Sequence, residues 1–195
     1  MENDIEQAIQ ILKDGGIGIF PTDTAFGIGC CINNESAVQR LFRIRKRPIT
    51  LAAPVLVNSI DMAQAYLKPI NNDVLTLMKK YWPGALTIVY PCILEKVSTL
   101  VRGGGATLGV RFPKSDIVQN LISGVGVPIL GPSANFHAEK TAYRKEELNL
   151  SLIDLVDFVI EGEATAQNVS TVIDCSQTPW KILREGTVKV EEING

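Results

Sequence analysis

The chain has 195 residues, of which 46% are hydrophobic and 21% are charged, and its formal net charge is −2. These proportions are ordinary for a globular protein, so they exclude an intrinsically disordered chain and do not suggest a membrane span. The acidic amino terminus lacks the basic start and apolar stretch of a signal peptide, so we expect a cytoplasmic protein. The length fits one domain, which we expect to span residues 1–195.

The small negative charge also limits the kind of ligand site. A chain coated in positive charge for duplex binding is excluded, so any anion site must be a local cluster. The four cysteines, Cys30, Cys31, Cys92 and Cys175, form no C-x-x-C pair, and His137 is the only histidine. We therefore expect no metal site, and we interpret the cysteines as small buried hydrophobes in a reducing compartment.

The expected elements intersperse helices with strands along the chain. Helices are expected at 4–14, 35–47, 59–67, 71–82, 115–122 and around 144–150. Strands are expected at 17–20, 25–32, 53–58, 84–91, 106–112, 127–132, 157–162, 170–175 and 181–185. Several of these strands are continuous apolar runs, which is typical of sheets covered by helices. We predict an α/β fold with a twisted, mixed parallel and antiparallel sheet and flanking helices.

A Pro-Thr-Asp-Thr turn at 21–24 separates the first two expected strands. The hydroxyls and the carboxylate at this bend can bind a small polar ligand. They can equally satisfy the backbone of the turn itself, as Asx and Ser/Thr turns do. The residues alone leave both interpretations open.

A cluster of cations closes the helix expected at 35–47. Arg43, Arg45, Lys46 and Arg47 fall within five residues, just before Pro48. One interpretation is a solvated helix end, where cations meet the negative end of the helix dipole. The other is a site for phosphate oxygens, to which arginine and lysine are well suited.

Further polar residues follow or interrupt apolar strands. Ser133 and Asn135 come directly after the strand at 127–132, where open α/β sheets place their ligands. Arg111 and Arg184 lie within apolar strands, so each requires an anion, either an internal carboxylate or a ligand. Together the hydroxyls, the amide and up to six cations suit a small substrate plus a polyphosphate. We expect them to line a large, electropositive, concave cavity.

Seven segments give a more specific indication. They are "FPTDTAFGIGC", "RKRP", "WPGALTIVY", "LGVRFP", "GPSANF", "STVID" and "LREG". In this order they resemble the YrdC-type threonylcarbamoyl-AMP synthases over nearly the whole chain. The resemblance implies a nucleotidyltransferase that joins L-threonine, bicarbonate and ATP into L-threonylcarbamoyladenylate and releases pyrophosphate. That product serves N6-threonylcarbamoyladenosine modification of tRNA at position 37.

The resemblance also implies roles for individual residues. It assigns the L-threonine site to Thr24, Arg111, Ser133 and Ser170. It assigns ATP binding to Arg47, Thr107, Asn135, Thr141, Tyr143 and Arg184, and catalysis to the segment of Arg45, Lys46 and Arg47. Magnesium is expected on the ATP phosphates, with no protein metal site. The implied partners, beyond the three substrates, are tRNA and the downstream threonylcarbamoyl-transferase proteins.

The chain departs from the family pattern at three positions. Arg45 stands at the usual lysine position, with Lys46 beside it as a substitute, Phe26 replaces a tyrosine, and Leu51 replaces a polar residue. Arginine is a planar fork and not an equivalent point charge. These departures leave two alternatives to the synthase. One is an RNA-binding module with the same fold, and the other is a divergent paralogue acting on a related carbamoyl-adenylate.

Overall fold

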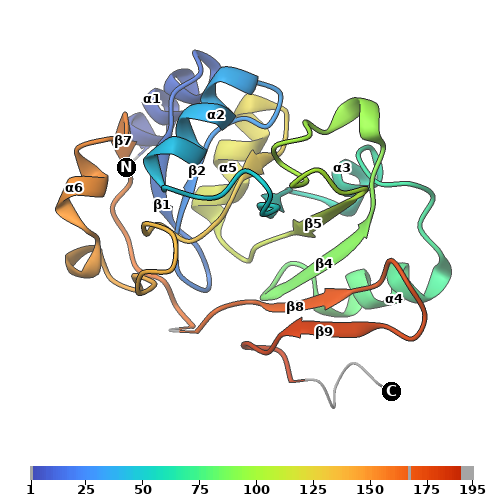
Figure 1. Cartoon of the computed structure of the whole chain (residues 1–195). Coiled ribbons are helices and arrows are strands. Elements are labelled where there is room, and N and C mark those ends of the chain that lie inside the picture. Colours follow the sequence, from blue (N-terminus) through green and yellow to red (C-terminus); the bar gives the residue numbers. More distant parts are fainter. Residues whose placement is uncertain (1, 167, 190–195) are drawn as a thin grey trace.

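The structure, a computed structural model, describes residues 2–166 and 168–189. The strands form a three-stranded and a six-stranded sheet (Figure 1). The smaller sheet has the order β2-β1-β7 and consists of β1 (Gly18–Pro21), β2 (Phe26–Gly29) and β7 (Phe158–Val159). The larger sheet has the order β6-β3-β5-β4-β8-β9. Its strands are β3 (Val55–Leu56), β4 (Leu86–Pro91), β5 (Thr107–Arg111), β6 (Ile129–Leu130), β8 (Thr171–Asp174) and β9 (Lys181–Arg184).

Both sheets are mixed, as the sequence predicts. Strand β1 is antiparallel to β2 and parallel to β7. In the larger sheet β3 and β5 are parallel, as are β4 and β8, while the other neighbours are antiparallel. The two sheets meet along β2, where Gly27 pairs with Ser133 and Cys31 with Ile129. This junction places Ser133 beside the turn that precedes β2.

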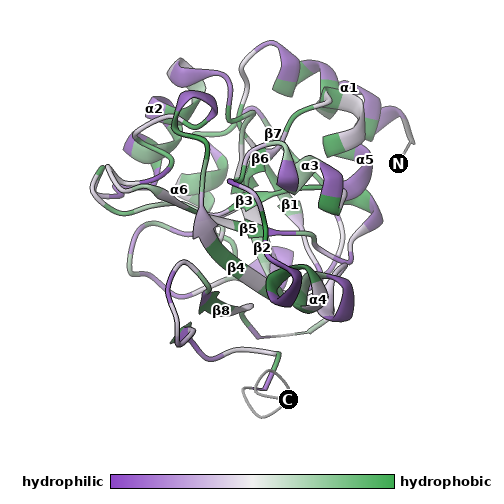
Figure 2. Cartoon of the chain, turned by 90° about the vertical axis from the view of Figure 1, so that its right-hand side faces the viewer, coloured by the Kyte–Doolittle hydropathy of each residue, from purple (hydrophilic) through white to green (hydrophobic). Residues whose placement is uncertain are grey.

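The helices pack around the sheets. They are α1 (Glu2–Lys13), α2 (Glu35–Ile44), α3 (Ile60–Gln64), α4 (Asn72–Tyr81), α5 (Asp116–Val125) and α6 (Leu150–Ile153), with 3-10 turns at Leu94–Lys96 and Lys145–Glu147. Helices α1, α2 and α5 gather around the smaller sheet, whereas α4 lies beside β4 and β8 (Figure 1). Hydrophobic and hydrophilic stretches alternate along these helices (Figure 2), which is typical of helices that bury one face.

Three helix predictions need correction. The helix expected at 59–67 is the shorter α3, which ends at Gln64. Helix α2 begins as expected, with Asn34 Oδ1 accepting a hydrogen bond from the Ala37 N–H, but it ends at Ile44 rather than at residue 47. Lys46 has a φ of 51°, in the left-handed region, so the helix cannot continue through it. The helix expected around 144–150 is instead the 3-10 turn Lys145–Glu147 followed by the short α6.

The interior agrees with the apolar pattern of the sequence. The largest fully buried side chains include Phe20, Phe26, Leu41 and Ile88. All four cysteines are free and buried, as expected. Among the described residues, no helix is long and apolar enough to cross a membrane.

Candidate active site

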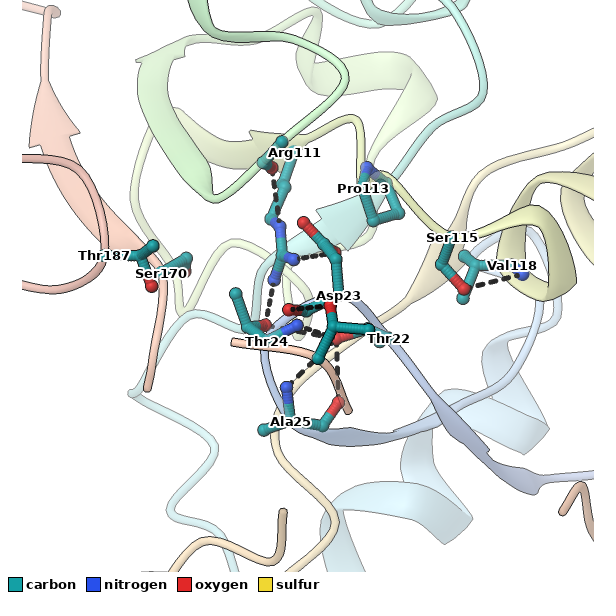
Figure 3. Close-up of polar contacts among 12 residues, drawn as sticks. Thr22, Asp23, Thr24, Ala25, Arg111, Pro113, Ser115, Val118, Ser170 and Thr187 are labelled. Atoms are coloured by element: carbon teal, nitrogen blue, oxygen red, sulfur yellow. Dashed lines mark hydrogen bonds and ion pairs between the residues drawn. The ribbon is translucent and has the colours of Figure 1, made fainter. Parts of the chain in front are cut away.

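The turn between β1 and β2 is held by the hydroxyl of its first threonine. Thr22 Oγ1 accepts from the N–H groups of Thr24 (3.1 Å) and Ala25 (3.2 Å) and donates to the Ala25 carbonyl oxygen (2.7 Å). Thr24 turns its own hydroxyl toward Arg111 at the end of β5 (Figure 3). The sequence left open whether this turn satisfies its own backbone or binds another group. In the structure Thr22 satisfies the backbone, and Thr24 contacts a side chain from the other sheet.

Each of the three guanidinium nitrogens of Arg111 makes one contact, which leaves a second N–H on Nη1 and on Nη2. Nη1 donates to Thr24 Oγ1 (2.7 Å), Nε donates to the Gly84 carbonyl oxygen (3.1 Å), and Nη2 forms an ion pair with Asp23 Oδ1. Burial lowers the pKa of Arg111, and the charge of Asp23 opposes that effect. The internal carboxylate that Arg111 requires is thus supplied by the turn.

A second set of polar side chains comes from β4 and β9 of the larger sheet and from the residue before β8. Ser170, directly before β8, receives a hydrogen bond from Arg184 Nη2 (2.8 Å) and shares one with Thr87 Oγ1 (2.9 Å). Arg184 Nε also donates to the Ser170 carbonyl oxygen (3.0 Å). These contacts fix Arg184 against β8, and its hydrogen-bond acceptors in the described part of the chain are a hydroxyl and a carbonyl oxygen.

The basic turn after α2 contributes two further arginines. Arg45 is buried and bonds to Asn135 through Nε (3.0 Å, to the backbone oxygen) and Nη2 (2.9 Å, to Oδ1), while its buried Nη1 has no partner among residues 2–166 and 168–189. Burial, and then the charge of Arg47, lower the pKa of Arg45 to about 10. Arg47 donates to the backbone oxygens of Leu51 and Ala52. Neither arginine has a carboxylate partner among these contacts.

These groups surround one cavity of about 160 Å³, formed by residues from both sheets. The predicted site residues that line it are Thr24, Arg45, Arg47, Arg111, Ser133, Thr141, Ser170 and Arg184. None of the lining residues, all within the described part of the chain, is acidic. Phe26, at the usual tyrosine position, is among the lining residues and contributes an apolar wall.

Four predicted site residues do not line this cavity. Lys46 is exposed and its Nζ lies 4.8 Å from the centroid of the Phe136 ring. Thr107 begins β5, at the opposite end of the strand from Arg111. Asn135 is hydrogen-bonded to Arg45, which does line the cavity, and Tyr143 belongs to the loop before the 3-10 turn at 145–147. Leu51, at the usual polar position, is exposed.

Two residues with clear contacts in the site were not among the predicted site residues. Asp23 pairs with Arg111, and its place inside the Pro-Thr-Asp-Thr turn was the available signal. Thr87 is buried and bonded to Ser170; its signal was a lone hydroxyl between the apolar Leu86 and Ile88. A buried threonine in an apolar strand is also common in cores without ligands, so only the contact reveals its place in the site.

The fold and the site together define an α/β domain whose two mixed sheets enclose an arginine-lined cavity. The chain belongs to the Sua5/YciO/YrdC family, whose model, described as "Telomere recombination", matches residues 10–186. The resemblance to the YrdC-type proteins is thereby confirmed.

Three relatives show how close the likeness is. A protein of Bacillus subtilis named threonylcarbamoyl-AMP synthase is 31% identical over 190 residues, which cover 97% of this chain and 55% of the relative. The structure of Pyrococcus abyssi Sua5 complexed with L-threonine matches with a TM-score of 0.95 and 31% identity, over 100% of this chain and 57% of the other. Escherichia coli YciO matches with a TM-score of 0.89 and 29% identity, over 99% and 94%. The chain spans about half the length of the first two relatives.

Proposed function

We propose that the chain is a threonylcarbamoyl-AMP synthase, a nucleotidyltransferase that forms L-threonylcarbamoyladenylate and pyrophosphate from L-threonine, bicarbonate and ATP. The observation that carries this proposal is the charge of the cavity. Four arginines line it without an acidic residue, and of the four only Arg111 has a carboxylate partner among the described residues, Asp23. Buried or partly buried cations without counterions are costly, so the cavity is suited to a ligand that carries several negative charges.

The proposed threonine site lies between the two sheets. Arg111 would hold the substrate carboxylate, with the hydroxyls of Thr24, Ser133 and Ser170 around it. Arginine binds carboxylates strongly because its planar fork matches their geometry. The relative from Pyrococcus abyssi, of nearly the same fold, is complexed with L-threonine, which supports a threonine site on this fold.

The nucleotide would lie across the mouth of the cavity. About 160 Å³ is small beside the roughly 300–1,000 Å³ of most ligand pockets. We therefore place threonine inside and ATP toward the partly exposed Arg47 and Thr141 and the exposed Arg184. Asn135, Thr107 and Tyr143 lie outside the cavity wall, so their proposed ATP contacts have no support from this geometry.

The proposed chemistry needs no covalent enzyme intermediate. The amine of threonine adds to CO2, or to bicarbonate with loss of water, to form a carbamate. A carbamate oxygen then attacks the α-phosphorus of ATP, and pyrophosphate leaves. The arginines would hold the reactants together and neutralise phosphate charge. Magnesium would enter with ATP as part of the substrate. In a cell, tRNA and the threonylcarbamoyl-transferase proteins that consume the adenylate would be the partners.

A second candidate is a divergent paralogue that acts on a related carbamoyl-adenylate in the same cavity. The observation that favours it is Arg45, which occupies the usual lysine position and is held by Asn135. Arginine cannot replace a lysine ammonium atom for atom, so the anion next to it need not be the same.

The test is pyrophosphate release from ATP by the purified chain, with threonine and bicarbonate omitted in turn. The synthase proposal predicts release that requires both. Arg45→Lys is measured in parallel. Pyrophosphate release by this variant but not by the unmodified chain would favour the second candidate. If neither protein releases pyrophosphate, although both are folded and bind ATP, the proposal is overturned.

A further inference from the structure

The amide side chain of Asn135 already bonds through both its oxygen and its nitrogen. Oδ1 accepts from Ser133 Oγ (2.8 Å) and from Arg45 Nη2 (2.9 Å). Nδ2 donates to the backbone oxygen of Glu139 (2.6 Å). The residue is 6% exposed and does not line the cavity. Because Asn135 is buried outside the cavity wall, with both accepting sites of Oδ1 already used, a direct contact with ATP in the cavity is not favoured by this geometry.

Arg45, in contrast, lines the cavity and keeps an unused donor. Its Nε and Nη2 both bond to Asn135, one to the backbone oxygen and one to the side chain. Its Nη1 is buried and has no partner among the described residues, although Arg45 lines the cavity. A buried donor without a partner costs free energy, so this nitrogen is expected to meet an acceptor when the cavity is occupied.

The backbone reinforces this arrangement. The His137 N–H donates to the Arg45 carbonyl oxygen (2.8 Å), so the segment that carries Asn135 is bonded to Arg45 through both main chain and side chain. A guanidinium group is rigid and planar, so holding two of its nitrogens fixes the direction of the third. A lysine side chain at the same position ends in a single nitrogen, so it cannot be held through two nitrogens while a third donates to a ligand.

We propose that Asn135 is a positioning residue that holds Arg45 so that Nη1 donates to a phosphate oxygen of the bound substrate. This inference rests on the proposed function, because it takes the ligand to be a polyphosphate. It differs from the family-based expectation that Asn135 contacts ATP itself. It also gives a physical reason why arginine would function in place of lysine here: the neighbouring loop supplies the two acceptors that orient it.

The test is a double-mutant cycle on the affinity for inorganic pyrophosphate, measured by titration calorimetry. The variants are Asn135→Ala, Arg45→Met and their combination. Arg45→Met keeps an unbranched apolar stem in place of the arginine stem and removes a buried charge that has no carboxylate partner among the described residues, so the fold should tolerate it. The bond from Nε to the backbone oxygen of residue 135 can persist in Asn135→Ala, which limits the disturbance.

We expect Asn135→Ala to weaken pyrophosphate binding about tenfold, the loss expected for one hydrogen bond to a charged group. In the Arg45→Met background the same substitution should change affinity less than twofold, because there is no guanidinium left to orient. Asn58→Ala serves as the matched control: it removes a side-chain amide bond to Ser123 (3.0 Å) outside the cavity and should leave affinity unchanged.

Two other results would overturn the inference in distinguishable ways. Equal losses in both backgrounds would show that Asn135 contacts the ligand itself, and the proposed function would stand. No pyrophosphate binding by the unmodified chain would remove the phosphate site, and the proposed function with it. If Asn135→Ala does not fold, Asn135→Ser is measured in the same cycle, because its hydroxyl is too short to reach Arg45 Nη2 as Oδ1 does.

Discussion

Asp23 and Arg111 form an ion pair whose side chains are 10% and 7% exposed, and it joins the turn after β1 to the end of β5 (Figure 3). The pair connects the two sheets at the wall of the cavity. Removing one member would leave a buried charge without its partner, which costs more than the pair itself contributes.

We therefore expect Asp23→Ala to lower the free energy of unfolding by about 3–5 kcal/mol, measured by urea denaturation. The double variant Asp23→Ala/Arg111→Met should be more stable than Asp23→Ala alone, because the orphaned cation is removed as well. Losses that simply add would show that the two side chains are energetically independent.

Arg111→Lys tests the proposed threonine site. A lysine keeps the charge but loses the fork that holds a carboxylate, so the KM for L-threonine should rise about tenfold or more, with the KM for ATP nearly unchanged. Arg102→Lys is the control, because Arg102 contacts only its own loop and lies outside the cavity wall. An equal rise in both KM values for Arg111→Lys would argue against a dedicated carboxylate contact.

Asp157 gives a prediction about pH. The hydrogen bond from Arg40 holds the pKa of this carboxyl below its ordinary range, against the opposing effect of burial, and the Ile17 N–H also donates to it (2.7 Å). Because the folded pKa is below the unfolded one, the stabilisation is present at neutral pH and is lost as pH falls through the folded pKa.

Asp157→Asn should accordingly cost about 1 kcal/mol at pH 7, and the difference from the unmodified chain should shrink below about pH 4. The exposed pair Lys145–Glu161 supplies the control: Glu161→Gln should change stability by less than about 0.5 kcal/mol. Urea titrations at several pH values measure both. A deficit for Asp157→Asn that is independent of pH would contradict the assignment.

A substitution at Gly29 tests how closely the two sheets pack where they meet. A Cβ atom at this position would lie far inside contact distance of the Leu130 carbonyl oxygen, which is backbone and cannot turn aside. Gly29→Ala should therefore destabilise the fold by about 1–3 kcal/mol or more. At Gly109 the nearest atom to an added Cβ is 3.6 Å away, so Gly109→Ala should be nearly neutral. Similar melting temperatures for the two variants would contradict this packing.

Much of the fold could be predicted from the sequence, because its strands are short apolar runs bounded by glycine, proline and polar turns. The pairing between β2 and the segment around Ser133 could not be predicted, because no local pattern specifies a contact between residues about 100 positions apart. The end of α2 was also missed, because the cations at 45–47 are good helix formers. In the structure Lys46 is left-handed, and the N–H groups of Lys46 and Arg47 donate back to the Arg43 and Phe42 carbonyl oxygens, which is a Schellman-type helix end.

The site, too, could be predicted only in part. The types of residue that gather in the cavity were predicted, since hydroxyls and arginines at strand ends are visible in the sequence. What each one contacts was not. Arg111 could have met a carboxylate or a ligand, and only the fold brings Asp23 to it. Asn135 was expected at the nucleotide, whereas its amide is occupied by Ser133, Arg45 and the loop.

The central claim, that this chain builds a threonylcarbamoyl adenylate, is tested most directly by identifying the product by mass spectrometry after incubation with ATP, L-threonine and 13C-bicarbonate. The account predicts an adenylate that contains threonine and is heavier by one mass unit than the product from ordinary bicarbonate, because the carbamate carbon comes from bicarbonate. Pyrophosphate release without such a product, or a product that lacks the label, would contradict it.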